Sequence, residues 1–145
     1  RLPGIVGPNL PAGRPWLHTI AKQLQLGEDV EYYNPKSLFN NICDLWTISD
    51  FITHLSTRTN LQRCSTVNLA ASKPIQLHRV IDLMRERLNS SSKITKQKTN
   101  KTSFTIETGI VENEYDYLPA TTTEMATRFV DDSFFHINNR QKDDP

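Results

Sequence analysis

Residues 1–8, Arg1-Leu2-Pro3-Gly4-Ile5-Val6-Gly7-Pro8, form the stretch on which the interpretation of the fold depends. An apolar run bounded by glycine and proline predicts a buried strand that ends at a turn. Gly4 and Gly7 allow another part of the molecule to approach the backbone closely, while Pro3 and Pro8 fix φ and carry no N–H. In an open α/β sheet the loop after such a strand is a common position for a ligand, and a plain β-turn at the edge of the core is the simpler alternative.

The bulk composition suits one globular domain, or a piece of a larger one. Of the 145 residues, 37% are hydrophobic and 23% are charged, and the formal net charge is +1. This charge gives no support for a nucleic acid or membrane partner, and no apolar run approaches the ~18 residues of a transmembrane helix. Cys43 and Cys64 have neither metal-ligand spacing nor a disulfide framework, so we expect reduced thiols in a cytoplasmic protein. Because the chain starts at Arg1 and not at Met, we expect an excised or processed fragment.

Hydrophobic periodicity predicts alternating helices and strands in the first part of the chain. Helices are expected over about residues 15–26, 48–56 and 76–88, and strands over residues 30–33, 40–46 and 65–71. Gly27 is expected to end the first helix in the left-handed conformation, and Thr47 is expected to cap the second. The mostly apolar residues 65–71 are typical of a strand that is buried on both faces in a parallel sheet.

The second part of the chain is more polar. Residues 89–102 are rich in Ser, Thr and Lys, so we expect a loop that buries too little apolar surface to order itself firmly. Residues 103–107 alternate as a strand does, and residues 108–114 are expected to form a short helix. Thr122 or Thr121 is expected to cap a last helix, with Glu124 available for a capping box.

The motifs of the common enzyme classes are absent from the sequence. No Gly-x-x-Gly-x-x-Gly or Gly-x-Gly-x-x-Gly follows a predicted strand, so this chain cannot hold a pyrophosphate as a Rossmann fold does. No Gly-x-Ser-x-Gly, His-Glu-x-x-His or Cys-x-x-Cys is present either. The four histidines stand in unrelated contexts, and we interpret them as surface or helix-flank residues. The sequence therefore predicts neither a catalytic residue nor a metal site.

The order of three stretches is more informative than any single motif. Residues 1–8 come first, then Phe39-Asn40-Asn41-Ile42 before residues 48–52, then Val67-Asn68-Leu69-Ala70 before residues 73–75. To about Phe134, this ordered set resembles the carboxyl-terminal half of an extended short-chain dehydrogenase/reductase of the NAD-dependent epimerase/dehydratase family.

The resemblance implies an α/β fold, with the late strands of a Rossmann-like parallel sheet and a small α/β substrate-binding lobe. Residues 1–134 would form this part, with residues 1–6 and 65–88 in the Rossmann sheet and its flanking helix. Residues 135–145 would be a polar tail, which we expect to be disordered from residue 136 onward.

The resemblance also implies roles for individual residues. The segment beside the nicotinamide matches Leu2, Pro3 and Gly4. The wall that meets a sugar nucleotide matches Asn9, Arg14, Trp16 and Leu17. Positions that carry a phosphate-binding Arg and an aromatic residue in sugar-nucleotide epimerases match Asn40 and Ile42, so diphosphate binding here would be weaker and less charged. Lys101 stands where the family often has an Arg that reaches the diphosphate.

The resemblance implies the substrate-binding half of an NAD(P)-dependent sugar-nucleotide epimerase, dehydratase or reductase, which is not catalytic by itself. Family members use a Tyr-x-x-x-Lys pair as acid and base, and this chain has none. The intact fold would bind NAD or NADP, but we expect this chain alone to bind neither. Expected partners are a sugar nucleotide and either a second copy or a missing amino-terminal half. The alternative is a non-catalytic binding or assembly module derived from the same fold.

Overall fold

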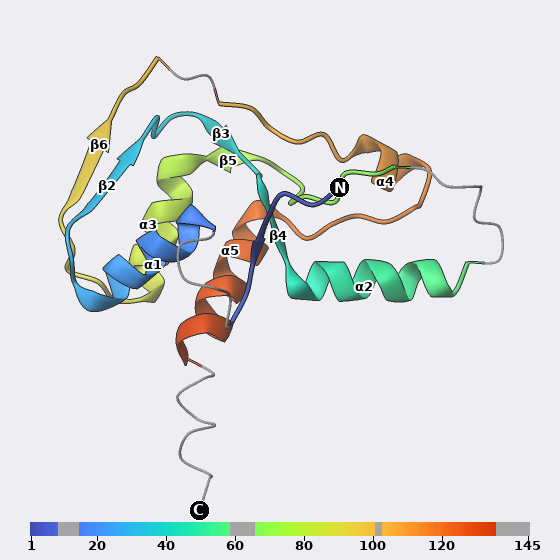
Figure 1. Ribbon diagram of the computed structural model, residues 1–145, viewed down its shortest axis with the longest axis horizontal. Helices are drawn as coiled ribbons and strands as arrows, with labels where there is room; N and C mark the ends of the chain where they lie inside the picture. The colour runs from blue at the N-terminus through green and yellow to red at the C-terminus, as the bar shows by residue number, and fades with distance from the viewer. Residues whose placement is uncertain (9–14, 59–65, 101–102, 136–145) are drawn as a thin grey trace, which may run out of the picture.

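The computed structural model describes residues 1–8, 15–58, 66–100 and 103–135. In chain order the elements are β1 (Gly4–Val6), α1 (Trp16–Leu26), β2 (Val30–Tyr33), β3 (Leu38–Phe39), β4 (Ile42–Asp44), α2 (Leu45–Ser56), β5 (Ile75–Gln76), α3 (Leu77–Arg87), β6 (Ile94–Gln97), α4 (Gly109–Asn113), α5 (Thr122–Val130) and a π-helical turn, η1 (Asp131–Phe135). Figure 1 shows an elongated molecule with β2, β6, α1 and α3 at one end, α2 and α4 at the other, and β1, β4 and α5 between them.

The described strands form three pairs. β1 runs parallel to β4, with Gly4 opposite Ile42, and β2 runs parallel to β6, with Val30 opposite Ile94. β3 and β5 form a short antiparallel pair. Parallel neighbours joined through helices are the mark of an α/β fold, so the expected fold class is confirmed.

The glycines of the first stretch are explained by the chain itself. Leu45 is the first residue of α2, and a Cβ on Gly7 would lie 2.9 Å from its side chain. A Cβ on Gly4 would lie 3.3 Å from the Asn41 carbonyl oxygen and 3.4 Å from the Pro15 side chain. The close approach that the two glycines predicted is therefore an approach of β1 to the chain that follows it.

The boundary between β4 and α2 corrects the sequence prediction. Residues 40–46 were expected to be one strand, but the strand ends at Asp44, and Leu45 already begins α2. Thr47 is not the cap. The Asp44 carboxylate accepts the Thr47 backbone N–H at 2.7 Å, because Asp44 has the extended backbone of an N-cap and Thr47 stands three residues later.

Two expected strands are absent from the described chain, and three unexpected strands, β3, β5 and β6, are present. Residues 66–71 form no strand, because Leu69 N–H donates to Arg1 and Ala71 N–H to Ile42, so their bonds are divided between two neighbours. Residues 103–107 form none either. The predicted loop over residues 89–102 instead contains β6, which pairs with β2 through the backbone. Its side chains are largely exposed, except that of Ile94, which is partly buried and packs against the apolar core.

The remaining helix predictions are confirmed. Gly27 ends α1 with a left-handed φ of 72°, and α3 and α4 lie within the expected ranges. Thr121 caps α5, and its side chain and that of Glu124 form the expected capping box. Of the expected tail, residues 135–145, Phe135 is the last residue of η1, and residues 136–145 lie outside the described residues.

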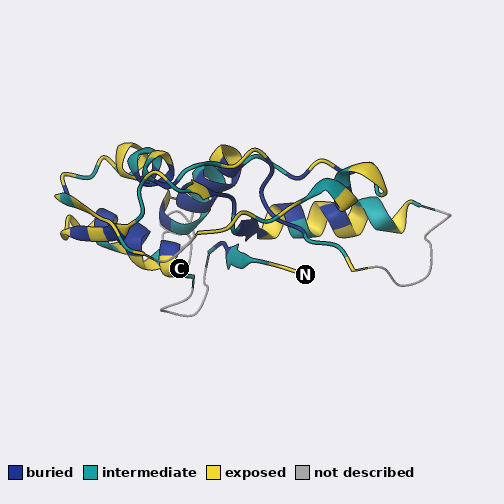
Figure 2. Ribbon diagram, turned by 90° about the horizontal axis from the view of Figure 1, so that it is seen from above, coloured by how far each residue is buried: buried dark blue, intermediate teal, exposed yellow. Residues whose placement is uncertain are grey.

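Two apolar clusters support this arrangement. The larger one packs α1, α3 and α5 together through side chains such as Leu17, Ile81 and Phe129. The smaller one lies under α2 and α4 and contains Cys43, Phe51, Leu69, Val111 and Tyr117. Figure 2 shows the consequence for α2, which is buried along one narrow side and otherwise intermediate or exposed.

Candidate functional site

Trp16, the first residue of α1, lies at the centre of the strongest candidate site. Its indole is 45% exposed and meets the Phe39 ring edge-on, with ring centroids 5.7 Å apart. Two cavities, of about 470 and 210 Å³, share Trp16, Tyr33 and Leu77 in their walls. We call this region, including Phe39 and Phe104, the Trp16 groove. It presents aromatic faces on which a planar ring can stack.

The alternation of β2 explains why Tyr33 faces this groove. Tyr32 points inward and is 2% exposed, whereas Tyr33 points outward and is 52% exposed. The Tyr33 hydroxyl donates to the Glu31 carboxylate at 3.0 Å, and this bond raises the pKa of Tyr33. Burial raises the pKa of Tyr32 to about 12. Both phenols therefore stay protonated at neutral pH, and Tyr33 provides a neutral ring.

Sequence reasoning found Trp16 but missed the other aromatic residues of the groove. Tyr33 was seen only as part of a strand, and Phe104 only as part of another. The period of two in residues 30–33 would have placed Tyr33 outward. No sequence signal placed Phe104, 69% exposed, in the wall of the 210 Å³ cavity.

The other predicted substrate-binding residues that the structure describes are buried. Leu17 is fully buried in the larger apolar cluster, and Ile42 is 1% exposed in β4. Asn40 is also 1% exposed, and its amide donates to the Ala71 and Ile106 carbonyls at 2.9 and 2.7 Å and accepts the Ile106 N–H at 2.8 Å. Its amide therefore joins two distant segments of the backbone. Asn9, Arg14 and Lys101 lie outside the described residues.

The segment that was predicted to lie beside the nicotinamide, Leu2 to Gly4, is a partly exposed stretch of backbone and does not form a pocket by itself. Leu2 is 48% exposed, and Pro3 and Gly4 are partly buried. The Asn41 carbonyl oxygen and the Pro15 side chain lie against the position that a Cβ on Gly4 would take. These residues fit a peptide edge against which a ring could lie, but they do not by themselves make a dinucleotide site.

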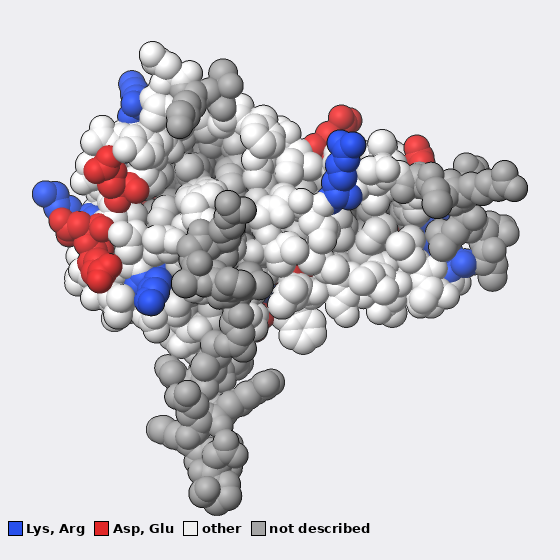
Figure 3. Space-filling model, in the orientation of Figure 1, with Lys and Arg blue, Asp and Glu red and all other residues white. Residues whose placement is uncertain are grey.

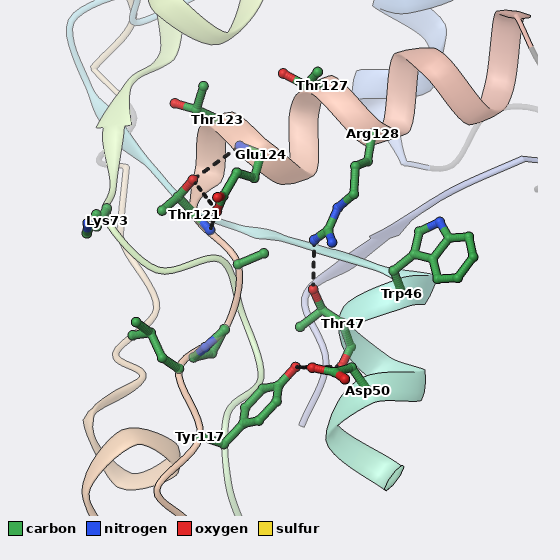
Figure 4. Close-up of a pocket in the computed structure, with 13 residues that line it drawn as sticks. Trp46, Thr47, Asp50, Lys73, Tyr117, Thr121, Thr123, Glu124, Thr127 and Arg128 are labelled. Atoms are coloured by element: carbon green, nitrogen blue, oxygen red, sulfur yellow. Dashed lines mark hydrogen bonds between the residues drawn. The ribbon is translucent and has the colours of Figure 1, made fainter. Parts of the chain in front are cut away.

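A third cavity, of about 900 Å³, lies between α2, α5 and the segment 117–121. In it the Tyr117 hydroxyl lies 3.1 Å from the Asp50 carboxylate and 3.2 Å from the Thr47 carbonyl (Figure 4). Burial, and then the bond to Asp50, raise the pKa of Tyr117. Arg128 reaches from α5 to the Thr47 hydroxyl at 3.3 Å. We call this the α2–α5 cavity.

Beneath this cavity, α2 and α5 are joined by a charge pair. Arg128 Nε lies 2.8 Å from Asp44 Oδ2, without the alignment of a hydrogen bond, and the Asp44 side chain is 3% exposed. The neighbouring Cys43 thiol has its pKa raised to about 12, mainly by burial. It therefore stays protonated and is a poor nucleophile.

The part of the chain that the structure describes contains neither a cluster of metal ligands nor a membrane-spanning helix. No group of three His, Cys, Asp or Glu side chains there could hold a metal ion. None of the described helices is both long and apolar enough to cross a membrane.

The fold, with its parallel pairs and connecting helices, has clear counterparts among solved structures. The ADP-L-glycero-D-manno-heptose-6-epimerase of Helicobacter pylori superposes with a TM-score of 0.72 at 15% identity, over 95% of this chain and 43% of that one. The UDP-glucose 4-epimerase of Thermotoga maritima, solved with UDP-glucose, gives 0.69 at 11% identity, over 96% and 45%. The dTDP-glucose 4,6-dehydratase of Bacillus anthracis, solved with NAD, gives 0.69 at 12% identity, over 97% and 44%. No family model and no curated protein matches the sequence.

These likenesses confirm the fold that the sequence resemblance implied. The described architecture is part of the fold of these epimerases and this dehydratase, and the chain spans less than half the length of the solved structures that it matches. At 11–15% identity they establish the fold alone, so activity, ligand and partners are matters for proposal.

Proposed function

We propose that this chain is the substrate-binding part of an NAD(P)-dependent sugar-nucleotide epimerase, dehydratase or reductase. The observation that carries the proposal is the Trp16 groove, an exposed aromatic surface on a fold shared with proteins solved with UDP-glucose and with NAD. The chain supplies the wall that holds the nucleotide and sets specificity. It supplies no hydride chemistry, because the sequence holds neither the phosphate-cradling glycines nor a Tyr-x-x-x-Lys pair.

Within the groove, Trp16 and Tyr33 would stack against the base, and Phe104 would cover it from the far side. Base–aromatic stacking is worth about 1–3 kcal/mol per base and tolerates any base, so the groove alone does not select the nucleotide. Asn40 and Ile42 would act by positioning β4 and Ile106, since both are buried. Asn9, Arg14 and Lys101 remain proposed contacts of the sugar or diphosphate.

Calorimetric titration of the chain with UDP, UDP-glucose and NAD tests the proposal. We expect saturable binding of the uridine nucleotides and none of NAD, for which most contacts would come from a glycine motif that is absent. Trp16→Ala should weaken UDP binding about tenfold or more, as the loss of one stacking partner implies.

Trp46→Phe is the matched control, because the second tryptophan lies in the α2–α5 cavity and outside the groove. It should leave UDP affinity unchanged. Tight NAD binding by the wild-type chain, or UDP binding that is indifferent to Trp16→Ala, would refute the proposal.

A further inference from the structure

The α2–α5 cavity plays no part in the proposed nucleotide site, and its lining contains equal numbers of positive and negative side chains. Two cations, Lys73 and Arg128, face two anions, Asp50 and Glu124. The net charge of the lining is therefore zero by count. A strongly charged ligand would meet a like charge whichever sign it carried, and so the lining favours a neutral ligand.

Hydroxyl groups supply most of the remaining polar surface. The lining includes Thr47, Thr121, Thr123, Thr127 and the phenol of Tyr117. The Tyr117 phenol, already bound to Asp50, can still accept, and the Thr47 hydroxyl, which accepts from Arg128, can still donate. Within the described chain, the Lys73 ammonium and the Thr127 hydroxyl, which both line the cavity, make no hydrogen bond or ion pair. The cavity thus offers donors and acceptors side by side.

Trp46 adds an apolar platform that is held in place. Its indole is 60% exposed, yet its N–H donates to the Asp132 carboxylate of η1 at 2.8 Å. Figure 4 places Trp46 on α2 beside Arg128, at one side of the cavity. An aromatic ring that is fixed through its polar atom and left open to solvent is pre-organised for an apolar surface.

We propose that the α2–α5 cavity binds a neutral saccharide. A sugar ring presents an apolar C–H face, which the Trp46 indole suits, and a rim of hydroxyls that both donate and accept, which Asp50, Arg128 and the threonines suit. The volume of about 900 Å³ lies within the range of ligand pockets, ~300–1,000 Å³, and leaves room for more than one ring. This site is separate from the Trp16 groove and does not depend on the proposed nucleotide function.

The test is saturation-transfer difference NMR on the full chain with maltose, cellobiose and lactose as probes. We expect saturable binding of at least one disaccharide with Kd on the order of 1 mM. Trp46→Ala should weaken it about tenfold or more, and Asp50→Asn, which keeps the side-chain shape but removes the charged acceptor, should weaken it several-fold. Trp46→Phe keeps an aromatic face without the N–H and should retain most of the binding.

Trp16→Ala separates the two proposed sites. It should weaken UDP binding about tenfold or more and leave disaccharide binding unchanged, while Trp46→Ala should weaken disaccharide binding about tenfold or more and leave UDP binding unchanged. The saccharide proposal is overturned if no probe binds saturably, if binding survives both Trp46→Ala and Asp50→Asn in variants with wild-type thermal unfolding, or if Trp16→Ala removes it. Inorganic phosphate competing with the disaccharide at equal concentration would also overturn it, since that would show an anion site.

Discussion

Asn40 shows how one buried side chain connects parts of the chain that are far apart in sequence. Its amide makes three hydrogen bonds, to the Ala71 carbonyl and to both backbone groups of Ile106. Burying these groups without partners would cost about 1–3 kcal/mol each. These bonds give Asn40 a structural reason to be an amide.

Asn40→Ala should therefore lower the free energy of unfolding by about 3 kcal/mol, because it leaves the buried Ala71 carbonyl and the two partly buried backbone groups of Ile106 without their partner at once. Urea denaturation measures the loss, and faster hydrogen exchange at the Ile106 amide localises it. Asn113→Ala is the matched control: this exposed amide at the end of α4 should change stability by less than about 0.5 kcal/mol. Weaker UDP binding by Asn40→Ala at unchanged stability would instead make Asn40 a direct ligand contact.

His18 is a second residue whose environment has a measurable consequence. Its ring packs against Phe129 and Phe134, with centroids 5.9 and 6.1 Å away. Burial lowers its pKa below the usual 6.5, and the charge of Lys22 lowers it further. The folded protein therefore binds this proton less readily than the unfolded chain does.

Stability should consequently fall as the pH drops from above 6.5 through the lowered pKa of folded His18, because the unfolded state takes up more protons in that window. Above pH 6.5 both states are neutral at this position, and the contribution is fully present. His18→Gln should flatten the dependence, measured by urea denaturation from pH 7.5 to pH 5. Parallel pH profiles for wild type and His18→Gln would rule out His18 as the source.

At the scale of elements, Asp44 fixes where β4 ends and where α2 begins. One carboxylate oxygen caps α2 through the Thr47 N–H, and the other lies 2.8 Å from Arg128 of α5. Asp44→Ala should cost about 2–4 kcal/mol, from the lost cap and from the partly exposed guanidinium left without its partner. Asp44→Asn should cost less, since the amide oxygen can still accept the cap bond.

Thr47→Val distinguishes this arrangement from a cap made by Thr47. The valine keeps the backbone N–H that Asp44 accepts and removes only the hydroxyl contact with Arg128. The variant should therefore be more stable than Asp44→Ala by thermal unfolding. Equal losses would show that the Thr47 hydroxyl is as important as the Asp44 carboxylate.

Elements whose own side chains are buried could be predicted from the sequence. The apolar stripe of α3, the glycine after α1 and the capping box of α5 all leave local patterns. β6 leaves none, because it is an edge strand whose polar side chains face solvent and whose order comes from backbone bonds to β2. For residues 66–71 the apolar pattern predicts burial but not strand pairing. It does not show that their backbone hydrogen bonds are divided between Arg1 and Ile42.

The candidate site, too, could be predicted only where a local sequence pattern marked a residue. Trp16 carried a sequence signal at the start of a helix, but the groove also needs Tyr33 and Phe104, from segments about 70 residues apart. Asp132, which holds Trp46, lies 86 residues from it. Such pairs are set by tertiary packing, which a periodicity along the chain does not encode.

At the scale of the whole molecule, the parallel sheet is incomplete on its own. Among the described strands, β1 pairs with β4 alone, so the other edge of β1 lacks a strand. Leu2, Leu45 and Ile52 are 48%, 43% and 60% exposed. α2 carries a single formally charged residue, and Figure 3 shows a largely uncharged surface over it. Open edges and apolar surface of this kind favour association.

We therefore predict that the chain in isolation dimerises, by edge pairing or by exchange of elements, or else is poorly soluble. Burying a few hundred Å² of apolar surface, at roughly 25 cal/mol per Å², provides several kcal/mol toward association. Sedimentation velocity at micromolar concentration tests this, with Ile5→Lys at the β1 edge and Ile52→Lys on α2 as the two informative variants. Loss of the dimer in Ile5→Lys alone assigns the contact to the strand edge, and loss in Ile52→Lys alone assigns it to the helix face. A wild-type monomer that stays soluble and unfolds cooperatively would show that β1 and α2 need no cover, and the substrate-binding-half proposal would then lose its structural need for a partner.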